Sequence, residues 1–379
     1  MIVASRYRLL ATGCASLAVL GEGGKGAVMK VATWIVLVGA GLMITCVESV
    51  CGASGARDYL NKPEEWYGGP EASRIAGSIL SYQSAEGGWP KNVDTTAEPY
   101  SGDRAKLKGT FDNGATTDEL RFLARVYQAR KSPPYREAFV RGLDHILKAQ
   151  YPSGGWPQYY PPGRQYHRHI TFNDGAMARL MEFLREVFAS ERYGFVDAGR
   201  RKSAQVAFDR GIECILRCQI KVEGKLTAWC AQHDEGDYSP RPGRPYEVAS
   251  ISGSESVGIV RLLMSLEEPS AEVIAAVEGA AAWFEAAKLR GIKVVLKEDA
   301  KAPKGRNKVV VEDAGAGPLW ARFYEIGTNR AMYCDRDGVV TYSLAEIGYE
   351  RRNGYAWLGD WPAELLAREY PAWKAKRRK

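Results

Sequence analysis

Apolar and polar positions follow one pattern three times along the chain. Each copy is an amphipathic stretch with helical spacing that ends in Ile-Leu-x-x-Gln and leads to a glycine and a tryptophan. The glutamines are Gln83, Gln150 and Gln219, and the tryptophans are Trp89, Trp156 and Trp229. The first two copies read Gly-Gly-Trp-Pro, and the third lacks the proline. Each copy therefore predicts a helix that ends at glycine and is followed by a turn.

A polar motif follows each of the first two tryptophans and begins another helix. Thr-Phe-Asp-Asn-Gly-Ala at 110–115 is echoed by Thr-Phe-Asn-Asp-Gly-Ala at 171–176, and apolar residues at helical spacing follow both. Thr116-x-x-Glu119 and Ser252-x-x-Glu255 have the form of capping boxes. Asp112 and Asp174 are interpreted as occupying corresponding positions of the repeat, at the starts of two helices.

This alternation predicts a mainly α protein built from three helical hairpins. Such hairpins bury one face against their neighbours and either close into an α/α ring or stack as a solenoid. In both arrangements the loops gather at one end, where the three tryptophans and the aspartates would form an aromatic-lined mouth suited to sugars. The last third differs: 320–343 predicts strands around a hairpin turn at 335–338, and 349–361 predicts a small sheet and loops.

The first 56 residues have the composition of a targeting segment. Residues 31–47 are uncharged, too short for a typical membrane span, and are followed by small residues that favour cleavage after Ala53 or Ala56. Met29 is a better start for a signal peptide than Met1, and a single membrane anchor is the alternative. We expect 1–56 to be a signal peptide, 57–373 the catalytic domain and 374–379 a frayed basic tail.

Export changes how the cysteines are interpreted. Cys214-x3-Cys218-x11-Cys230-x2-His233 superficially resembles a zinc site, but the first two cysteines lie in an apolar helical pattern that is typical of buried structural cysteine. One disulfide is compatible with secretion, and its pairing does not follow from the sequence.

Composition and charge narrow the class of ligand. The net charge is +7, and no basic block outside the C-terminal tail suggests nucleic acid. The 40 glycines, 20 tyrosines and 10 tryptophans indicate turn-rich loops and flat apolar surfaces that suit sugar rings. A mild positive excess is compatible with an anionic substrate.

Two kinds of chemistry fit the polar residues. Paired carboxylates across a sugar cleft act as general acid and base in hydrolysis, or they bind a hard cation such as Ca²⁺; alternatively, both aspartates are simply helix caps. Arg244 lies in the stiff, proline-rich segment Arg-Pro-Gly-Arg-Pro-Tyr-Glu at 241–247. An arginine fork matches carboxylates, so arginines together with a metal would bind a polymer with one carboxylate per sugar.

Several motifs resemble those of the pectate lyases of polysaccharide lyase family 10. They are GGWPKN at 87–92, TFDNGAT at 110–116, GGWPQYYP at 154–161, ITFNDGAM at 170–177, RPYE at 244–247, SGSES at 252–256, TNR at 328–330, CDRDG at 334–338 and ERRNGYAWLGDWP at 350–362. The resemblance spans essentially the whole mature chain. It implies an (α/α)3 toroid with a small β-containing part and Ca²⁺-dependent β-elimination on polygalacturonate.

The resemblance also assigns roles to residues. Arg244 matches the catalytic arginine, the Brønsted base, although Pro245 stands where a small residue is expected. Asp174 and Asp112 match the aspartates of the calcium and substrate centre. Arg330 matches an arginine that binds the galacturonate carboxylate. The further residues that we expect to bind substrate are Asn113, Lys91, Arg352, Tyr355 and Trp156.

Two other functions remain open on the sequence alone. The first is a glycoside hydrolase of the α/α type with Asp112 and Asp174 as acid and base, and the second is a non-catalytic polysaccharide-binding protein. For the lyase we expect a periplasmic or secreted monomer that binds pectin or polygalacturonate, requires Ca²⁺, and has no nucleic-acid partner and no stable membrane association once the signal is removed.

Overall fold

The structure is a computed structural model and describes residues 55–377. These residues lie in one compact unit. The predicted signal peptide falls almost entirely outside the described residues. Within 55–377, no helix has both the length and the apolar character needed to cross a membrane. Ala56, the last residue of the predicted signal peptide, is only 1% exposed and packs in the core, and the boundary between 56 and 57 stays a prediction.

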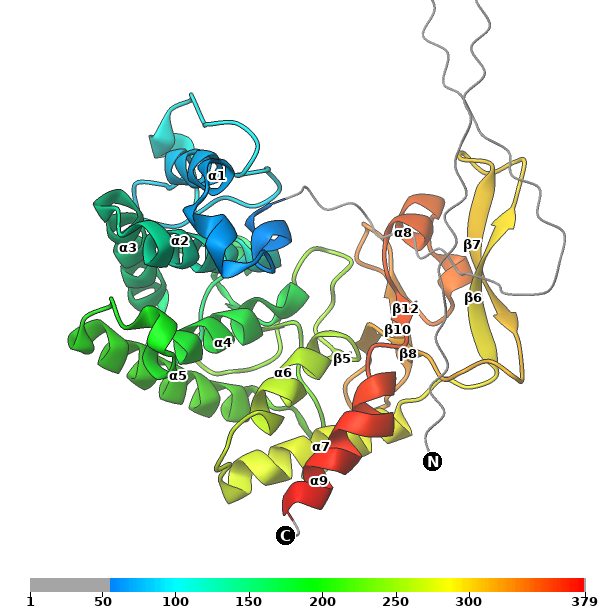
Figure 1. Ribbon diagram of the computed structural model, residues 1–379. Coiled ribbons are helices and arrows are strands. Elements are labelled where there is room, and N and C mark those ends of the chain that lie inside the picture. The colour runs from blue at the N-terminus through cyan, green and yellow to red at the C-terminus, as the bar shows by residue number, and fades with distance from the viewer. Residues whose placement is uncertain (1–54, 378–379) are drawn as a thin grey trace, which may run out of the picture. The chain divides into compact units, whose positions relative to one another are not determined.

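Helices form most of the structure and stack in two series (Figure 1). One series consists of α1 (Pro70–Ser81), α3 (Pro133–Ala149), α5 (Ala198–Cys218) and α7 (Ala271–Ala286), each in contact with the next. The other consists of α2 (Thr117–Arg130), α4 (Ala176–Ala189) and α6 (Glu255–Met264), which also contact in turn. The prediction of a mainly α protein is confirmed. The closed (α/α)3 toroid stays a prediction.

The threefold repeat has a common set of hydrogen bonds. The indole N–H groups of Trp89, Trp156 and Trp229 donate to carbonyls near the ends of α1, α3 and α5, at 2.7, 2.9 and 2.7 Å. The glutamine amides that close these helices each donate to two carbonyls, one of them on the next helix of the series at 2.8–2.9 Å. The last carbonyls of a helix have no partner within it, so each indole satisfies one of them. The glutamines join neighbouring repeats.

The tryptophans therefore do not line a mouth. All three are 0% exposed. The expectation of an aromatic-lined opening built from them is wrong, because the indole N–H needed a buried partner and drew the ring into the core.

The hydroxyls of the two predicted capping boxes have different partners. The Ser252 hydroxyl accepts the backbone N–H of Glu255 at 3.1 Å. The Thr116 hydroxyl instead accepts the backbone N–H of Trp89 at 2.9 Å and donates to the Thr110 carbonyl. Thr116 thus ties the tryptophan turn to the start of α2.

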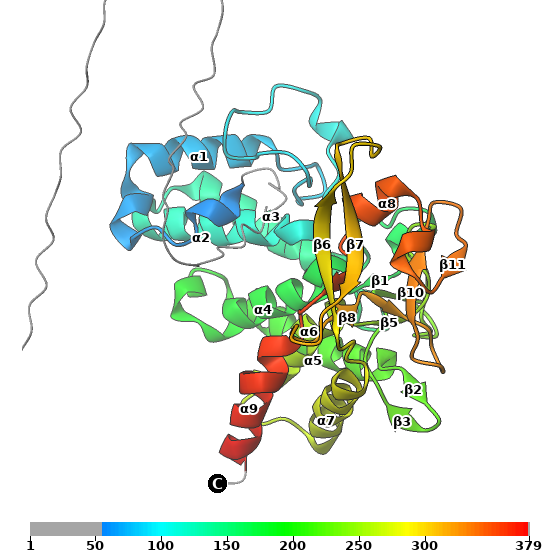
Figure 2. The same ribbon diagram turned by 90° about the vertical axis from the view of Figure 1, so that its right-hand side faces the viewer.

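The strands are short and lie mainly in the last third (Figure 2). A four-stranded sheet has the order β11 (Val340–Thr341), β10 (Ala331–Cys334), β9 (Phe323–Tyr324) and β5 (Ile251–Ser252). The remaining strands form antiparallel pairs: β1 (Ile170–Thr171) with β4 (Gln232–His233), β2 (Lys221–Val222) with β3 (Lys225–Leu226), β6 (Ile292–Glu298) with β7 (Arg306–Glu312), and β8 (Trp320–Ala321) with β12 (Leu358–Gly359). The hairpin turn predicted at 335–338 is confirmed between β10 and β11.

Three parts of the C-terminal third differ from expectation. The seven-residue strands β6 and β7 were not predicted. The segment 349–361 holds α8 (Tyr349–Gly354) before β12 rather than only sheet and loops. Residues 374–377 continue α9 (Tyr370–Arg377), in which the Lys374 ammonium lies 3.6 Å from the Glu278 carboxylate. That ion pair ties the predicted tail to α7.

The described cysteines are structural. Cys214, Cys218, Cys230 and Cys334 are buried and free. His233 turns its Nε2 to the backbone N–H of Cys230 at 3.0 Å, so this nitrogen is already occupied. The zinc interpretation of this segment has no support among the described residues.

Candidate active site

Two short, strained loops lie next to each other and carry the polar motifs. They are the 3₁₀ turns 112–114 and 173–175, which contact each other after the buried residues Phe111 and Phe172. Asn113 and Asp174 adopt left-handed backbone angles, with φ of 55° and 48°. A non-glycine residue there carries strain that the surroundings must hold in place.

The two loops correct the alignment of the repeat. Asn113, not Asp112, occupies the position that corresponds to Asp174, and Asp112 corresponds to Asn173. The order of aspartate and asparagine is exchanged between the copies. The expectation that the two aspartates sit at corresponding positions is therefore wrong by one residue, and each carboxylate has a different environment.

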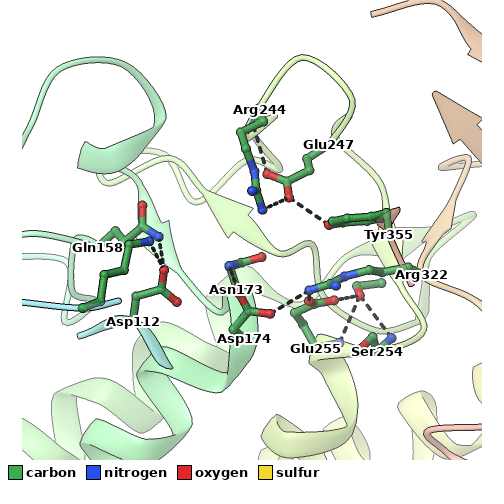
Figure 3. Close-up of polar contacts among 12 residues, drawn as sticks. Asp112, Gln158, Asn173, Asp174, Arg244, Glu247, Ser254, Glu255, Arg322 and Tyr355 are labelled. Atoms are coloured by element: carbon green, nitrogen blue, oxygen red, sulfur yellow. Dashed lines mark hydrogen bonds and ion pairs between the residues drawn. The ribbon is translucent and has the colours of Figure 1, made fainter. Parts of the chain in front are cut away.

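A polar cavity of about 190 Å³ opens over these loops (Figure 3). Five of the predicted site residues line it: Lys91, Asp112, Asn113, Asp174 and Arg244. The other lining residues are Asn92, Gln158, Tyr166, Asn173, Gln232 and Glu247.

Asp112 is buried and partly paired. Its Oδ2 accepts hydrogen bonds from the Lys91 ammonium and from the Gln158 amide, the latter at 2.7 Å. Its Oδ1 is buried and has no partner among the described residues. Burial lowers the pKa of Lys91, but the charge and hydrogen bond of Asp112 raise it by more, so the net pKa is raised and Lys91 stays cationic.

Asp174 projects from its strained loop toward the other side of the cavity. Its Oδ1 accepts a hydrogen bond from Arg322 at 2.9 Å, and its Oδ2 accepts one from Asn173 at 2.7 Å. The same Arg322 nitrogen also binds the buried Glu255 carboxylate. Arg322 lies over the Tyr355 ring, 4.9 Å from its centroid, so one buried guanidinium joins Asp174 to α6 and to the segment after α8.

Arg244 is held by one carboxylate. Glu247 accepts from the Arg244 guanidinium at 2.5 Å and from its backbone N–H at 3.0 Å. The Tyr355 hydroxyl donates to the same Glu247 carboxylate at 2.8 Å. Burial lowers the pKa of Arg244, but Glu247 together with Tyr246 and Tyr355 raises it by more, so its pKa lies above the ordinary value.

Beside Arg244 lies a cluster of cations around one aromatic ring. The guanidiniums of Arg244, Arg351 and Arg336 lie 5.1, 4.5 and 5.7 Å from the centroid of Tyr246. Glu350 is paired with both Arg351 and Arg336. With Glu247 and Glu350 counted, the three arginines leave an excess of one positive charge beside the Arg244 side of the cavity, which favours an anion.

Three of the predicted substrate-binding residues lie elsewhere. Trp156 is fully buried and has no surface to offer a sugar. The Arg330 guanidinium stacks on Tyr342, 3.5 Å from the ring centroid, at the turn between β9 and β10. Arg352 donates to Asn307 and to the Ala345 and Ile347 carbonyls, and lines a separate cavity of about 510 Å³. The structure places none of the three in the cavity over the two loops.

The sequence analysis overlooked residues that the structure brings into or beside the cavity. Gln158 follows the second Gly-Gly-Trp-Pro directly, and Glu247 ends the Arg-Pro-Tyr-Glu motif, so both stood inside quoted motifs. Arg322, which reaches Asp174, lies in no repeat and in no motif that the sequence singled out. No local pattern could have identified it.

The cavity offers donors that fit a hard cation. Asp112 Oδ1, Gln158 Oε1 and Gln232 Oε1 are buried oxygens without a partner among the described residues, and Asp174 adds a carboxylate. Carboxylate and amide oxygens are the ligands that Ca²⁺ prefers, and no sulfur or imidazole lines this cavity.

A second cluster of metal-ligating types lies outside this cavity. His169, Asp234 and Glu235 are close enough together to share an ion. However, Glu235 accepts from Arg168 and contacts His169 at 3.1 Å, and Asp234 is paired with Arg241 at 2.9 Å. These carboxylates are already neutralised within the protein, which disfavours a metal there.

Comparison with known proteins agrees with this site. A family model described as pectic acid lyase matches residues 83–366. Two solved structures are similar: a family 10 polysaccharide lyase from Cellvibrio cellulosa, and a point mutant of it in complex with trigalacturonic acid. Each is 36% identical to this chain and covers 82% of it; the matches cover 94% and 95% of those chains, with TM-scores of 0.69 and 0.70. No curated protein matches. The chain belongs to the pectic acid lyase family and is a polysaccharide lyase.

Proposed function

We propose that this protein is a pectate lyase that cleaves de-esterified polygalacturonate by Ca²⁺-dependent β-elimination, with Arg244 as the base. The observation that carries the proposal is that Arg244 shares one cavity with Asp112 and Asp174, whose surroundings leave buried oxygens without partners. The products would be 4,5-unsaturated oligogalacturonates. The complex of the related lyase with trigalacturonic acid supports the substrate class.

The chemistry explains why cations are needed. β-Elimination removes the proton on C5, next to the sugar's carboxylate, and expels the oxygen on C4. Because the carboxylate is already charged, a second negative charge must develop on it. Lys91 and the arginines beside Tyr246 provide positive charge at the two sides of the cavity, and a single contact of this type is worth about 3–4 kcal/mol in a transition state.

Calcium would add to this stabilisation. We infer that Asp112, Asp174 and the Gln158 and Gln232 amide oxygens hold the ion, which supplies electrophilic neutralisation of the sugar's carboxylate. Lys91 then keeps one Asp112 oxygen occupied and leaves the other for the ion. Arg322 orients Asp174 through the hydrogen bond to its Oδ1.

Arg244 must lose a proton to act as the base. At about pH 8.5 this costs about 5 kcal/mol for an ordinary guanidinium, and Glu247 increases that cost. We infer that productive substrate binding separates Arg244 from Glu247, whose carboxylate keeps the Tyr355 hydroxyl as a partner. This reasoning predicts an alkaline pH optimum.

Two variants in one loop test the assignment. Arg244→Lys removes the base but keeps a positive charge, and kcat on polygalacturonate should fall by about 10³-fold, as measured by the near-ultraviolet absorbance of the unsaturated product. Arg241→Lys is the control, because Arg241 stands in the same segment and pairs with Asp234 outside the cavity. If Arg244→Lys keeps most of its kcat, the base is another group.

The same assay tests the metal and the competing reaction. EDTA should abolish product, and added Ca²⁺ should restore it. Metal-independent release of saturated sugars would refute elimination and would support the hydrolase alternative. Secretion or periplasmic location and a monomeric state remain predictions, which fractionation and sedimentation would check.

A further inference from the structure

A second, larger cavity adjoins the one that holds Arg244. It has a volume of about 700 Å³, within the usual range of about 300–1,000 Å³ for ligand sites. It shares Lys91, Asn92, Asn113 and Asp174 with the first cavity, so the two form one continuous groove across the strained loops. We call this second cavity the Arg179 pocket. Its other lining residues include Arg57, Asp118, Glu119, Arg179 and Arg322.

Arg179 forms no ion pair with another residue of 55–377. It lies on α4, and its one hydrogen bond within residues 55–377 goes from Nη1 to the backbone carbonyl of Asp174. No carboxylate of residues 55–377 lies within ion-pair distance of the Arg179 guanidinium. Asp174 forms an ion pair with Arg322, and Asp118 forms ion pairs with Arg57 and Arg121. Most of the guanidinium's donors thus remain available to a ligand.

The neighbours make this arrangement costly in the empty protein. Burial lowers the pKa of Arg179 and the nearby Arg57 lowers it further, and the charges of Asp118, Asp174 and Asp112 offset this only in part, so its net pKa is lowered. Because Arg179 stays protonated at ordinary pH, the cost remains as a desolvated charge beside the like charge of Arg57. A bound anion would remove both penalties.

Arg57 is placed to take part. Its side chain is 54% exposed, and Nε binds Asp118 Oδ2 at 3.0 Å, which leaves the two terminal nitrogens of the fork. It comes from the short helix η1 (Ala56–Tyr59), which packs on α2. Two guanidiniums from different elements therefore face one pocket, an arrangement that suits a carboxylate.

We propose that Arg179, assisted by Arg57, forms a subsite for the carboxylate of a second galacturonate unit, on the other side of Asp174 from Arg244. The inference rests on the proposed function, because it takes the ligand to be a uronate polymer. A chain lying along the groove would place one acidic sugar near Arg244 and a further one in the Arg179 pocket.

Binding measured without catalysis tests the subsite. Titration calorimetry in EDTA would compare a long, fully de-esterified oligogalacturonate with its fully methyl-esterified form. Arg179→Gln keeps an N–H donor for the Asp174 carbonyl but removes the charge, and it should weaken binding of the acidic oligomer about tenfold. Arg185→Gln is the matched control, since Arg185 also lies on α4 but binds Ser265 outside the groove. Arg179→Lys should recover part of the loss.

The outcomes separate the two proposals. If Arg179→Gln and Arg185→Gln bind the acidic oligomer equally well while the wild type still cleaves polygalacturonate, the subsite is wrong and the proposed function stands. If the wild type neither binds the acidic oligomer in EDTA nor cleaves it with added Ca²⁺, both proposals fail. Equal losses for the acidic and the esterified oligomers, or a lowered melting temperature that explains the loss, would assign Arg179 a structural role and overturn the subsite.

If Arg179→Gln does not fold, Arg57→Gln should weaken binding of the acidic form alone, and unchanged binding would overturn the proposal.

Discussion

Glu119 gives the folded protein a pH dependence that a single substitution should remove. This residue lies on α2, is buried, and borders the Arg179 pocket. Its Oε1 accepts from the Thr95 hydroxyl at 3.0 Å, whereas its Oε2 has no partner among the described residues. Burial, and then the charge of Asp118, raise the pKa of Glu119 from 4.5 to about 7.

The sign and size of the change in stability follow from the difference between the pKa of Glu119 in the folded and the unfolded state. In the folded state Glu119 holds its proton up to about pH 7, whereas the unfolded chain loses it near pH 4.5. The folded state therefore binds more protons between these values, and stability must fall as the pH rises through this window. At about 1.4 kcal/mol per unit of pKa, the loss amounts to about 3 kcal/mol.

Urea unfolding at a series of pH values from about 4.5 to 8 measures this loss. Glu119→Gln keeps the shape and removes the titration, so its free energy of unfolding relative to wild type should increase by about 3 kcal/mol across the series. Glu98→Gln, at an exposed position, is the control and should leave the slope unchanged. A constant difference between Glu119→Gln and wild type at all pH values would refute the reasoning.

Four further predictions concern the site and the core. Arg322→Ala leaves the buried Glu255 without its cation and should cost about 3–5 kcal/mol in urea unfolding; a loss below about 1 kcal/mol would contradict this. Trp156→Phe should lose about 1–3 kcal/mol of stability with the KM for polygalacturonate unchanged, and a raised KM would restore a substrate role. Arg330→Gln should change KM by no more than about twofold, because its guanidinium lies on Tyr342. Glu247→Gln should lower the pKa of Arg244 and move the rise in kcat/KM to lower pH, and an unmoved profile would argue against an arginine base.

The repeat made the helices predictable, because burial of one face at helical spacing determines where a helix lies. It also located the strained loops, since Asp112 and Asp174 both line the cavity. The sequence led to a wrong prediction for the three tryptophans. A large aromatic residue next to a predicted cleft can pack in the core as well as bind a sugar. The indole hydrogen bond to a helix end decides between them, as at Trp156.

The arginines show where a local pattern stops being informative. Arg330 stands in a motif, yet it lies on Tyr342, whereas Arg322 stands in none and reaches Asp174. These positions are eight residues apart, on opposite sides of the β9–β10 hairpin turn, so only the strand pairing decides which guanidinium points to the cavity. Strands β6 and β7 depend on the same kind of pairing.

The glutamine and tryptophan bonds recur in three copies, whereas the loops they support do not carry the same charge. The first loop bears its carboxylate one residue earlier than the second, and the third copy has serines at 252 and 254 in that region. The supporting hydrogen bonds are thus the same in all three copies, whereas the loops differ in the position of their charge. Exchanging Asn173 and Asp174 would move a negative charge by one residue and remove the carboxylate that Arg322 binds, while the glutamine and tryptophan hydrogen bonds would stay intact.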